Sequence, residues 1–384
     1  MTYDVVFIGE KRLGKTSVLA SMVNSFKRIG TGFQVKPANK LTEDIMREKI
    51  IELKKAFDDA DANGDIYFDT EETATKSFDK LSYLISYSEG GYEQPIADLV
   101  FHDVPGGLFD NKQVNDQDTA DFSTQYEKLQ NLIDEADILV FAIDSPLLME
   151  ENGKFFTYAT KPDELSIRIA SCMKTGKVRT ILFVPLKCEK YFKAHQMEEL
   201  SEKVKQYYRP VIEKFGNEPF KSTTTIAITP ILTMGNMVFQ DFERGQNGKV
   251  LMNIQTRRPQ RTYFKAVARF EPKYCEQPLL YVFDLMVKAG QYRNKLYVKQ
   301  GGAKSSTEES LDKWLAMNIG KGSPDKAVAA AALYGVGKAF FLAKRGITYA
   351  YRKNQYNKNP FNQLELQPKK SGEGYSVIQS PSGL

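Results

Sequence analysis

Short runs of consecutive apolar residues recur along the chain as far as Gly235, and glycine, proline or charged residues follow each of them. Continuous runs of this length, rich in β-branched and aromatic residues, are typical of strands buried on both faces of a parallel sheet. We therefore predict buried strands within Val5–Ile8, Ala97–Gly107, Ala136–Pro146, Arg179–Tyr191 and Thr223–Gly235.

Between these runs, apolar residues recur at helical spacing. Two such faces are formed by Val18, Leu19, Met22 and Val23, and by Ile45, Ile50, Ile51, Leu53 and Phe57. A further strand is predicted at Tyr263–Phe270, and an amphipathic helix at Glu276–Ala289. Because strands alternate with helices, we expect an α/β fold, a three-layer sandwich whose mostly parallel sheet is covered by helices on both faces.

Changes in composition divide the chain into three parts. Residues 1–290 hold the alternating strands and helices and form one domain. Residues 291–353 are predicted to form a helical extension, because Ser323 and Pro324 are typical of a helix start and an apolar face with flanking basic residues follows them. Residues 354–384 lack an apolar period, and we expect them to be disordered.

A glycine-rich segment joins the first predicted strand to the first predicted helix. Gly9 and Gly14 enclose four residues, and Lys15 and Thr16 follow at once, which is the pattern G-x-x-x-x-G-K-[ST] of a phosphate-binding loop. The glycines let backbone N–H groups close around phosphate oxygens, Lys15 reaches the β and γ phosphates, and the Thr16 hydroxyl is a ligand for Mg²⁺. The remaining residues of the predicted nucleotide contact are Arg12, Leu13 and Ser17.

A second signal follows the second apolar run. Asp103 ends this run, and Asp103–Gly106 spell D-x-x-G. The carboxylate of Asp103 is placed to hold Mg²⁺ through water, and the N–H of Gly106 is placed to bond a γ phosphate. In an α/β sheet both residues fall beyond the carboxyl ends of the strands, which is where ligands of such sheets bind.

With these motifs the chain resembles the P-loop GTPases of the translation-factor and Ras-like (TRAFAC) class. The resemblance rests on Gly9–Thr16, Asp103–Gly106 and the strand that ends at Lys187, and it covers residues 1–290. The strings "DVPGG" and "EPKYCEQPLLYVFDLM" look most like bacterial double-GTPase-type proteins of conflict and phage-defence gene clusters. The resemblance implies a P-loop NTPase fold that binds GTP or GDP with Mg²⁺.

In that class an N-K-x-D motif selects guanine, and this chain departs from it. Here the motif reads Leu186, Lys187, Cys188 and Glu189. The Lys187 stem is able to stack on the base, and Glu189 offers a carboxylate that is one methylene longer than aspartate. Leu186 lacks the amide of asparagine. The prediction that the site selects guanine is therefore weaker than the prediction that it binds a nucleotide, and an adenine nucleotide stays an alternative.

The class also closes a threonine over Mg²⁺ and the γ phosphate. Thr70, Thr73 and Thr75 precede an apparent strand, and we favour Thr75 or Thr73. The resemblance therefore implies the metal-binding set Thr16, Thr75 and Asp103.

Gly107 bears on the rate of hydrolysis. Ras-like enzymes carry a glutamine at this position, which orients the attacking water. We therefore expect slow hydrolysis that a partner stimulates, unless Arg12 or His102 takes over that role. The predicted catalytic set consists of Lys15, Thr75, Gly106 and Gly107.

A competing motif occupies Asp59–Thr70, which matches a calcium-binding loop at several positions. The twelfth position of such a loop is a bidentate glutamate, whereas this chain carries Thr70 there. We favour the interpretation that this stretch ends the helix before it.

Composition and charge narrow the setting. The 384 residues include 3 cysteines without paired spacing and 2 histidines, which argues against a disulfide framework or a zinc site. The N-terminus lacks a secretory signal pattern, and we expect a cytoplasmic protein. The net charge of +5 is uneven, because residues 289–384 carry 15 Lys and Arg against 6 Asp and Glu. A protein partner of the C-terminal helical region is the first expectation, and a membrane surface or nucleic acid is the alternative.

Three functions are compatible with these patterns. The first is a GTP-binding switch with Mg²⁺-dependent, slow hydrolysis, in which γ phosphate orders the segments around Thr75 and Gly107. The second is a P-loop ATPase or kinase, which Leu186 and Glu189 favour. The third is a nucleotide-loaded scaffold with negligible hydrolysis.

Overall fold

The structure is a computed structural model that describes residues 2–9, 13–27, 33–60, 79–89, 92–104, 119–173, 177–253, 258–286 and 376–380. Several sequence predictions lie outside these residues. They concern Arg12, Thr70, Thr73, Thr75, Gly106, Gly107, most of the calcium-like stretch and the helical extension at 291–353.

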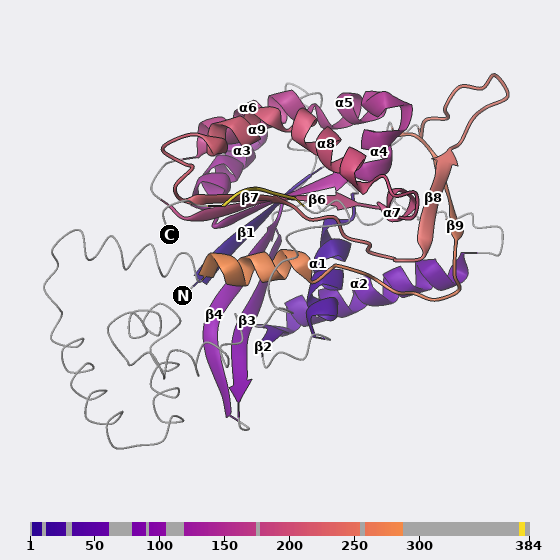
Figure 1. The fold of residues 1–384 in the computed structure, drawn as a ribbon. Helices are drawn as coiled ribbons and strands as arrows, with labels where there is room; N and C mark the ends of the chain where they lie inside the picture. Colours follow the sequence, from indigo (N-terminus) through magenta and orange to yellow (C-terminus); the bar gives the residue numbers. More distant parts are fainter. Residues whose placement is uncertain are drawn as a thin grey trace, which may run out of the picture.

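An eight-stranded sheet forms the middle of the molecule, in the order β10-β7-β6-β5-β1-β4-β3-β2 (Figure 1). Its strands are β1 (Thr2–Ile8), β2 (Phe33–Pro37), β3 (Asp79–Glu89), β4 (Tyr92–Asp103), β5 (Ile138–Asp144), β6 (Arg179–Leu186), β7 (Thr224–Ile228) and β10 (Ser376–Gln379). The strands from β7 to β4 in this order run parallel, whereas β3, β2 and β10 extend the sheet in antiparallel fashion. The mostly parallel sheet and its central strands are thus confirmed.

Helices cover both faces of the sheet, which confirms the three-layer α/β prediction (Figure 1). Their bounds are α1 (Lys15–Phe26), α2 (Lys40–Asp59), α3 (Thr119–Glu135), α4 (Ser145–Met149), α5 (Lys154–Thr160), α6 (Pro162–Cys172), α7 (Glu189–Lys193), α8 (Met197–Tyr207), α9 (Arg209–Gly216) and a helix over 277–286, with a 3-10 turn η2 (Glu150–Gly153) after α4. One hydrophobic cluster joins the sheet to α1 and residues 277–286, and a second joins its other face to α3, α6, α8 and α9. None of the described helices is long and apolar enough to cross a membrane.

Alternation along β1 and β5 explains the two clusters. In β1, Val5 and Phe7 belong to the cluster on the α1 side, whereas Val6 and Ile8 belong to the other. Successive side chains of a strand point to opposite faces, so a strand without polar interruptions is buried on both. The fully apolar runs therefore indicated the central position of these strands correctly.

The predicted apolar face of α2 is partly wrong. Asn39 caps the helix, because its side chain accepts a hydrogen bond from the Thr42 N–H at 2.9 Å. Leu53 and Phe57 are buried as predicted, but 57% of Ile51 is exposed. Ile51 lies about 200° around the helix from Leu53, so its side chain points away from the buried face.

A two-stranded hairpin outside the main sheet consists of β8 (Met237–Phe242) and β9 (Arg261–Lys265). The strand predicted at Tyr263–Phe270 corresponds to β9, which begins and ends earlier than predicted. Phe239 and Phe242 of β8 are buried against the same cluster as α8 and α9. The hairpin is therefore packed on the domain.

The expectation of a disordered C-terminal tail does not hold for Ser376–Gln379. These residues form β10 and pair with β7 in antiparallel orientation. A four-residue strand is too short for a periodic apolar pattern, and its pairing partner lies far away in the sequence. The sequence offered no local signal for this contact.

Candidate functional site

The polar residues singled out in the sequence gather at the carboxyl edge of the sheet. Gly9 follows β1, Asp103 ends β4, Asp144 ends β5 and Lys187 follows β6. These four strands are neighbours and run parallel, so their ends meet at one edge. Ligands of open α/β sheets bind at this edge.

Both loop glycines have a structural reason. A Cβ on Gly9 would lie 3.1 Å from the carbonyl oxygen of Ala142 and 3.2 Å from a methyl carbon of Leu13, so a side chain there would be crowded. Gly14 precedes α1 with a φ of 93°, a left-handed conformation that glycine adopts readily. The Leu13 side chain is buried in the core, which leaves only its backbone to face a nucleotide. Ser17 follows in the first turn of α1 and is half-buried.

Lys15 folds over the loop that it follows. Its side chain is buried, and Nζ donates a hydrogen bond to the carbonyl oxygen of Gly9 at 3.3 Å. Helix α1 begins at the same residue, so its N-terminus adds the positive end of the helix dipole. An ammonium group and a helix N-terminus at one loop favour an anion such as a phosphate.

Thr16 and Asp103 are in direct contact. The hydroxyl of Thr16 donates a hydrogen bond of 2.6 Å to Oδ2 of Asp103, although 87 positions separate the two residues. Mg²⁺ prefers oxygen ligands and binds through one or two protein groups together with waters and substrate phosphates. This oxygen pair fits such an ion. Within the described ranges, no group of three or more His, Cys, Asp or Glu residues could hold a metal through the protein alone.

His102 does not share the site with Asp103. Its Nε2 lies 2.7 Å from Oδ1 of Asp4 on β1, and the imidazole is buried. The hydrogen bond to His102 is the main cause that lowers the pKa of Asp4. His102 is therefore engaged in a contact between strands, which gives no support to a role in orienting water.

Lys187 takes part in a buried group of charges. Its backbone has a φ of 56°, and Nζ lies 3.2 Å from Oδ2 of Asp144. Arg261 of β9 donates to both carboxylate oxygens of Asp144, at 3.0 and 2.9 Å. Burial alone would raise the pKa of Asp144, but the charges of Arg261 and Lys187 outweigh it and hold this pKa well below its usual range. Asp144 is therefore ionised and fixes the direction of the Lys187 side chain.

Glu189 is also buried, and it fastens the loop that follows β7. Its Oε1 accepts hydrogen bonds from the backbone N–H groups of Met234 at 3.4 Å and Gly235 at 3.3 Å. Burial raises the pKa of the Glu189 carboxyl to about 7. The carboxylate thus joins the start of α7 to the loop after β7, and its predicted contact with a base stays a prediction.

The raised pKa of Glu189 predicts a distinct pH dependence. Between about pH 4.5 and 7 the folded protein binds a proton at Glu189 that the unfolded chain releases, so this residue's contribution to stability falls as pH rises. Over this pH range the contribution of Glu189 to the free energy of unfolding falls by about 3 kcal/mol. In the Glu189→Gln variant this contribution disappears, so its free energy of unfolding in urea declines less between pH 5 and 7.5.

Glu213→Gln is the matched control, because Glu213 lies at an exposed position on α9. It is expected to follow the pH dependence of the unmodified protein. If Glu189→Gln follows it equally closely, the assignment of a protonated Glu189 is wrong.

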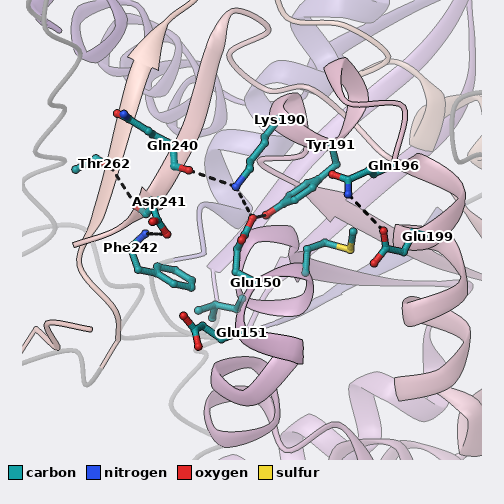
Figure 2. A network of polar contacts seen from close by, with 12 residues as sticks. Glu150, Glu151, Lys190, Tyr191, Gln196, Glu199, Gln240, Asp241, Phe242 and Thr262 are labelled. Carbon is teal, nitrogen blue, oxygen red and sulfur yellow. Dashed lines mark hydrogen bonds and ion pairs between the residues drawn. The ribbon is translucent and has the colours of Figure 1, made fainter. Parts of the chain in front are cut away.

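A polar network holds α7, the helix that begins at Glu189, in place (Figure 2). Oε1 of Glu150 accepts hydrogen bonds from Nζ of Lys190 at 2.6 Å and from the Tyr191 hydroxyl at 2.8 Å. Lys190 also donates to the carbonyl oxygen of Gln240 on β8 at 3.3 Å. The network connects α7 to the η2 turn and to the hairpin, so both support the predicted base-reading segment.

Sequence reasoning missed Arg261. Asp144 stood out as the acid that ends an apolar run, but nothing in the local sequence marks Arg261 as its partner. The two residues lie 117 positions apart and meet only because the hairpin folds back onto the sheet edge. The only sequence signal is a strand-terminal acid that needs a partner once it is buried.

No protein-family model matches the chain, and no curated protein matches it. Among solved structures, it is similar to Era from Aquifex aeolicus bound to GDP.AlF4-, with 13% identity, a TM-score of 0.29 and coverage of 60% of this chain and 51% of that chain. The Ski7 GTPase-like domain of S. cerevisiae bound to GTP has 14% identity, a TM-score of 0.32 and coverage of 61% and 43%. The Arl6 BBS3 small GTPase from Trypanosoma brucei has 14% identity, a TM-score of 0.27 and coverage of 61% and 88%.

The matched region thus spans about half the length of Era. Similarity at this level carries no conclusion about ligand or activity.

Proposed function

We propose that the protein is a Mg²⁺-dependent GTP-binding switch that hydrolyses GTP slowly unless a partner stimulates it. One observation carries the proposal: Thr16 contacts Asp103 directly beside the buried Lys15, at the carboxyl edge of the sheet. A cation ligand, a carboxylate and an ammonium group at one glycine loop are the parts that a metal-bound triphosphate requires.

Each described residue has a separate part in this proposal. Gly9 and Gly14 allow the loop backbone to approach the phosphates, and Lys15 exchanges its bond to the Gly9 carbonyl for phosphate oxygens. Thr16 and Asp103 hold Mg²⁺, whose charge offsets that of the phosphates when it is bound. Thr75, Gly106 and Gly107 enter the proposal from the sequence alone.

The nucleobase is the less direct part of the proposal. Lys187 follows β6 at the edge where a base would lie, and its direction is set by Asp144. Glu189 has its Oε1 engaged with Met234 and Gly235, so a guanine would have to share that carboxylate. This engagement is the observation that keeps an ATPase or kinase as the second candidate function.

We predict slow turnover by the isolated full-length chain. Gly107 lacks a side chain to orient water, and an added arginine in enzymes of this chemistry raises rates by ~10³ to 10⁵. The single-turnover rate with MgGTP is therefore expected to lie well below ~1 s⁻¹, the lower range of efficient enzymes. The same assay with MgATP is expected to give a still lower rate.

The outcomes of this assay separate the candidate functions. A rate of ~1 s⁻¹ or more with GTP would show that an intrinsic residue orients water and would end the idea of a partner-dependent switch. Faster turnover of ATP than of GTP would favour the ATPase. Binding without turnover, even after addition of cell extract, would favour the scaffold.

The wider role of the switch is proposed from the sequence alone. The basic helical extension at 291–353 is the proposed partner-binding region, with an anionic membrane or nucleic acid as alternatives. A part in bacterial defence is proposed from the resemblance stated for the motifs, and a cytoplasmic location is proposed from the cysteine usage of the chain. Loss of partner binding on deletion of residues 291–353 would support the assignment of this extension as the partner-binding region.

A further inference from the structure

The outer edge of β7 is occupied by a strand from the far end of the chain. Ser376 lies opposite Ile228, Val377 opposite Ala227 and Gln379 opposite Ile226, with a register shift between Val377 and Gln379. The yellow strand beside β7 in Figure 1 is this segment, β10. Residues 287–375 separate it in sequence from the last helix of the domain.

The Gln379 side chain connects β10 to backbone carbonyl groups of α9, of the segment before β7 and of β7. Its Nε2 lies within hydrogen-bond distance of three backbone carbonyl oxygens, those of Phe215 at 2.9 Å, Thr224 at 2.9 Å and Lys221 at 3.4 Å. Phe215 belongs to the last turn of α9, where carbonyl groups have no partner within the helix. An amide is the side-chain group that offers two N–H donors on one nitrogen without a charge.

Three features indicate that β10 is held weakly enough to exchange. The strand has only four residues, and all of them are half-buried. The register shift interrupts its ladder, and Ile378 is the apolar residue that packs against the core. The entropy cost of ordering four residues is similar in size to what these few contacts return.

The β7 edge itself is built to bind a strand. Thr224–Ile228 are all buried in the presence of β10, and removal of β10 would leave a row of backbone groups without partners. Such an edge recognises an extended peptide through main-chain hydrogen bonds, while a side-chain pocket supplies selectivity. Here the pocket is the group of carbonyls that surrounds the amide of Gln379.

We propose that the β7 edge and the carbonyls of Phe215, Lys221 and Thr224 form a binding site for an extended, glutamine-bearing peptide. The chain's own Ser376–Gln379 is its occupant and acts as a detachable ligand in the same molecule. Because Val377 and Ile378 precede Gln379 in β10, the site is expected to prefer extended peptides with β-branched residues before a glutamine. It lies at the opposite end of the sheet order from β2 and does not depend on the identity of the nucleotide.

Competition with a free peptide tests this proposal in the full-length chain. The probe is a fluorescent synthetic peptide with the sequence of residues 373–382, and its affinity is measured by fluorescence anisotropy. The Gln379→Ala chain is expected to bind this peptide about 10-fold more tightly than the unmodified chain does, because its own tail competes less well. A peptide with alanine in place of glutamine is expected to lose most of this binding.

Gln367→Ala is the matched control for the chain, since it removes a tail glutamine outside β10, and it should bind the peptide as the unmodified chain does.

Hydrogen exchange gives an independent readout: amides of β7 should exchange faster in Gln379→Ala and slow again when peptide is added. The proposal is overturned if neither chain binds the peptide and β7 exchange is unchanged. A dimer that Gln379→Ala abolishes would also overturn it, by placing the tail on a second copy.

Discussion

Replacement of Lys15 with alanine is expected to lower the affinity of the full-length protein for MgGTP by about 10²-fold. The ammonium group is buried at the loop, and a hydrogen bond from a charged donor contributes about 1.5 to 3 kcal/mol. In the absence of nucleotide the fold should survive, because the described apolar clusters do not include Lys15. Isothermal titration of both proteins with MgGTP measures the difference.

Lys27→Ala is the matched control for this experiment. Lys27 is exposed at the opposite end of the same helix, so its removal should leave the affinity for nucleotide unchanged. Equal affinities in the unmodified protein and in Lys15→Ala would contradict the assignment of the phosphate-binding loop. An equal loss in Lys27→Ala would point to a general effect on α1.

Replacement of Arg261 with methionine is expected to lower the free energy of unfolding by about 3 to 5 kcal/mol. The substitution keeps an unbranched chain in place but removes both hydrogen bonds to Asp144, whose carboxylate is fully buried and ionised. Lys187, with its Nζ at 3.2 Å, and Arg258 would then be the cations that offset that charge. Urea unfolding of the nucleotide-free protein at neutral pH measures the loss.

Two further variants make this result specific. Arg244→Met removes an ion pair between Arg244, which lies between β8 and β9, and Glu151 of the η2 turn, but this pair is exposed and should contribute little to stability. Asp144→Asn combined with Arg261→Met should regain part of the stability, because no buried charge is left unpaired. If Arg261→Met lowers the free energy of unfolding no more than Arg244→Met does, the buried charge group does not stabilise the fold.

The central strands and the glycine loop could be predicted because their signals are local. The four apolar residues Val5–Ile8 indicate a strand that is buried on both faces, and Gly14 marks the turn into α1. Asp103 was predicted at the mouth of the site because it ends such a run, and its contact with Thr16 agrees with that position. Local sequence thus specified the phosphate end of the site.

The other half of the site depends on contacts between distant segments. Arg261 reaches Asp144 from a hairpin, Glu189 is occupied by a loop after β7, and β10 is recruited from beyond residue 370. In none of these segments does the local sequence pattern indicate which distant segment it will contact. Ile51 is a different case, because its spacing from Leu53 already places it on the opposite side of α2, so its apolar side chain alone is no sign of burial.

The loop from Gly9 to Ser17 and the Asp103 carboxylate are together proposed to bind the triphosphate of a nucleotide with Mg²⁺. The most direct measurement is an isothermal titration of the unmodified full-length protein with GTP, in the presence of Mg²⁺ and again with a chelator. We predict a single site whose affinity falls sharply when Mg²⁺ is removed, because the oxygens of Thr16 and Asp103 are placed to hold that ion. Absence of binding in Mg²⁺, or an affinity that the chelator leaves unchanged, would contradict the claim.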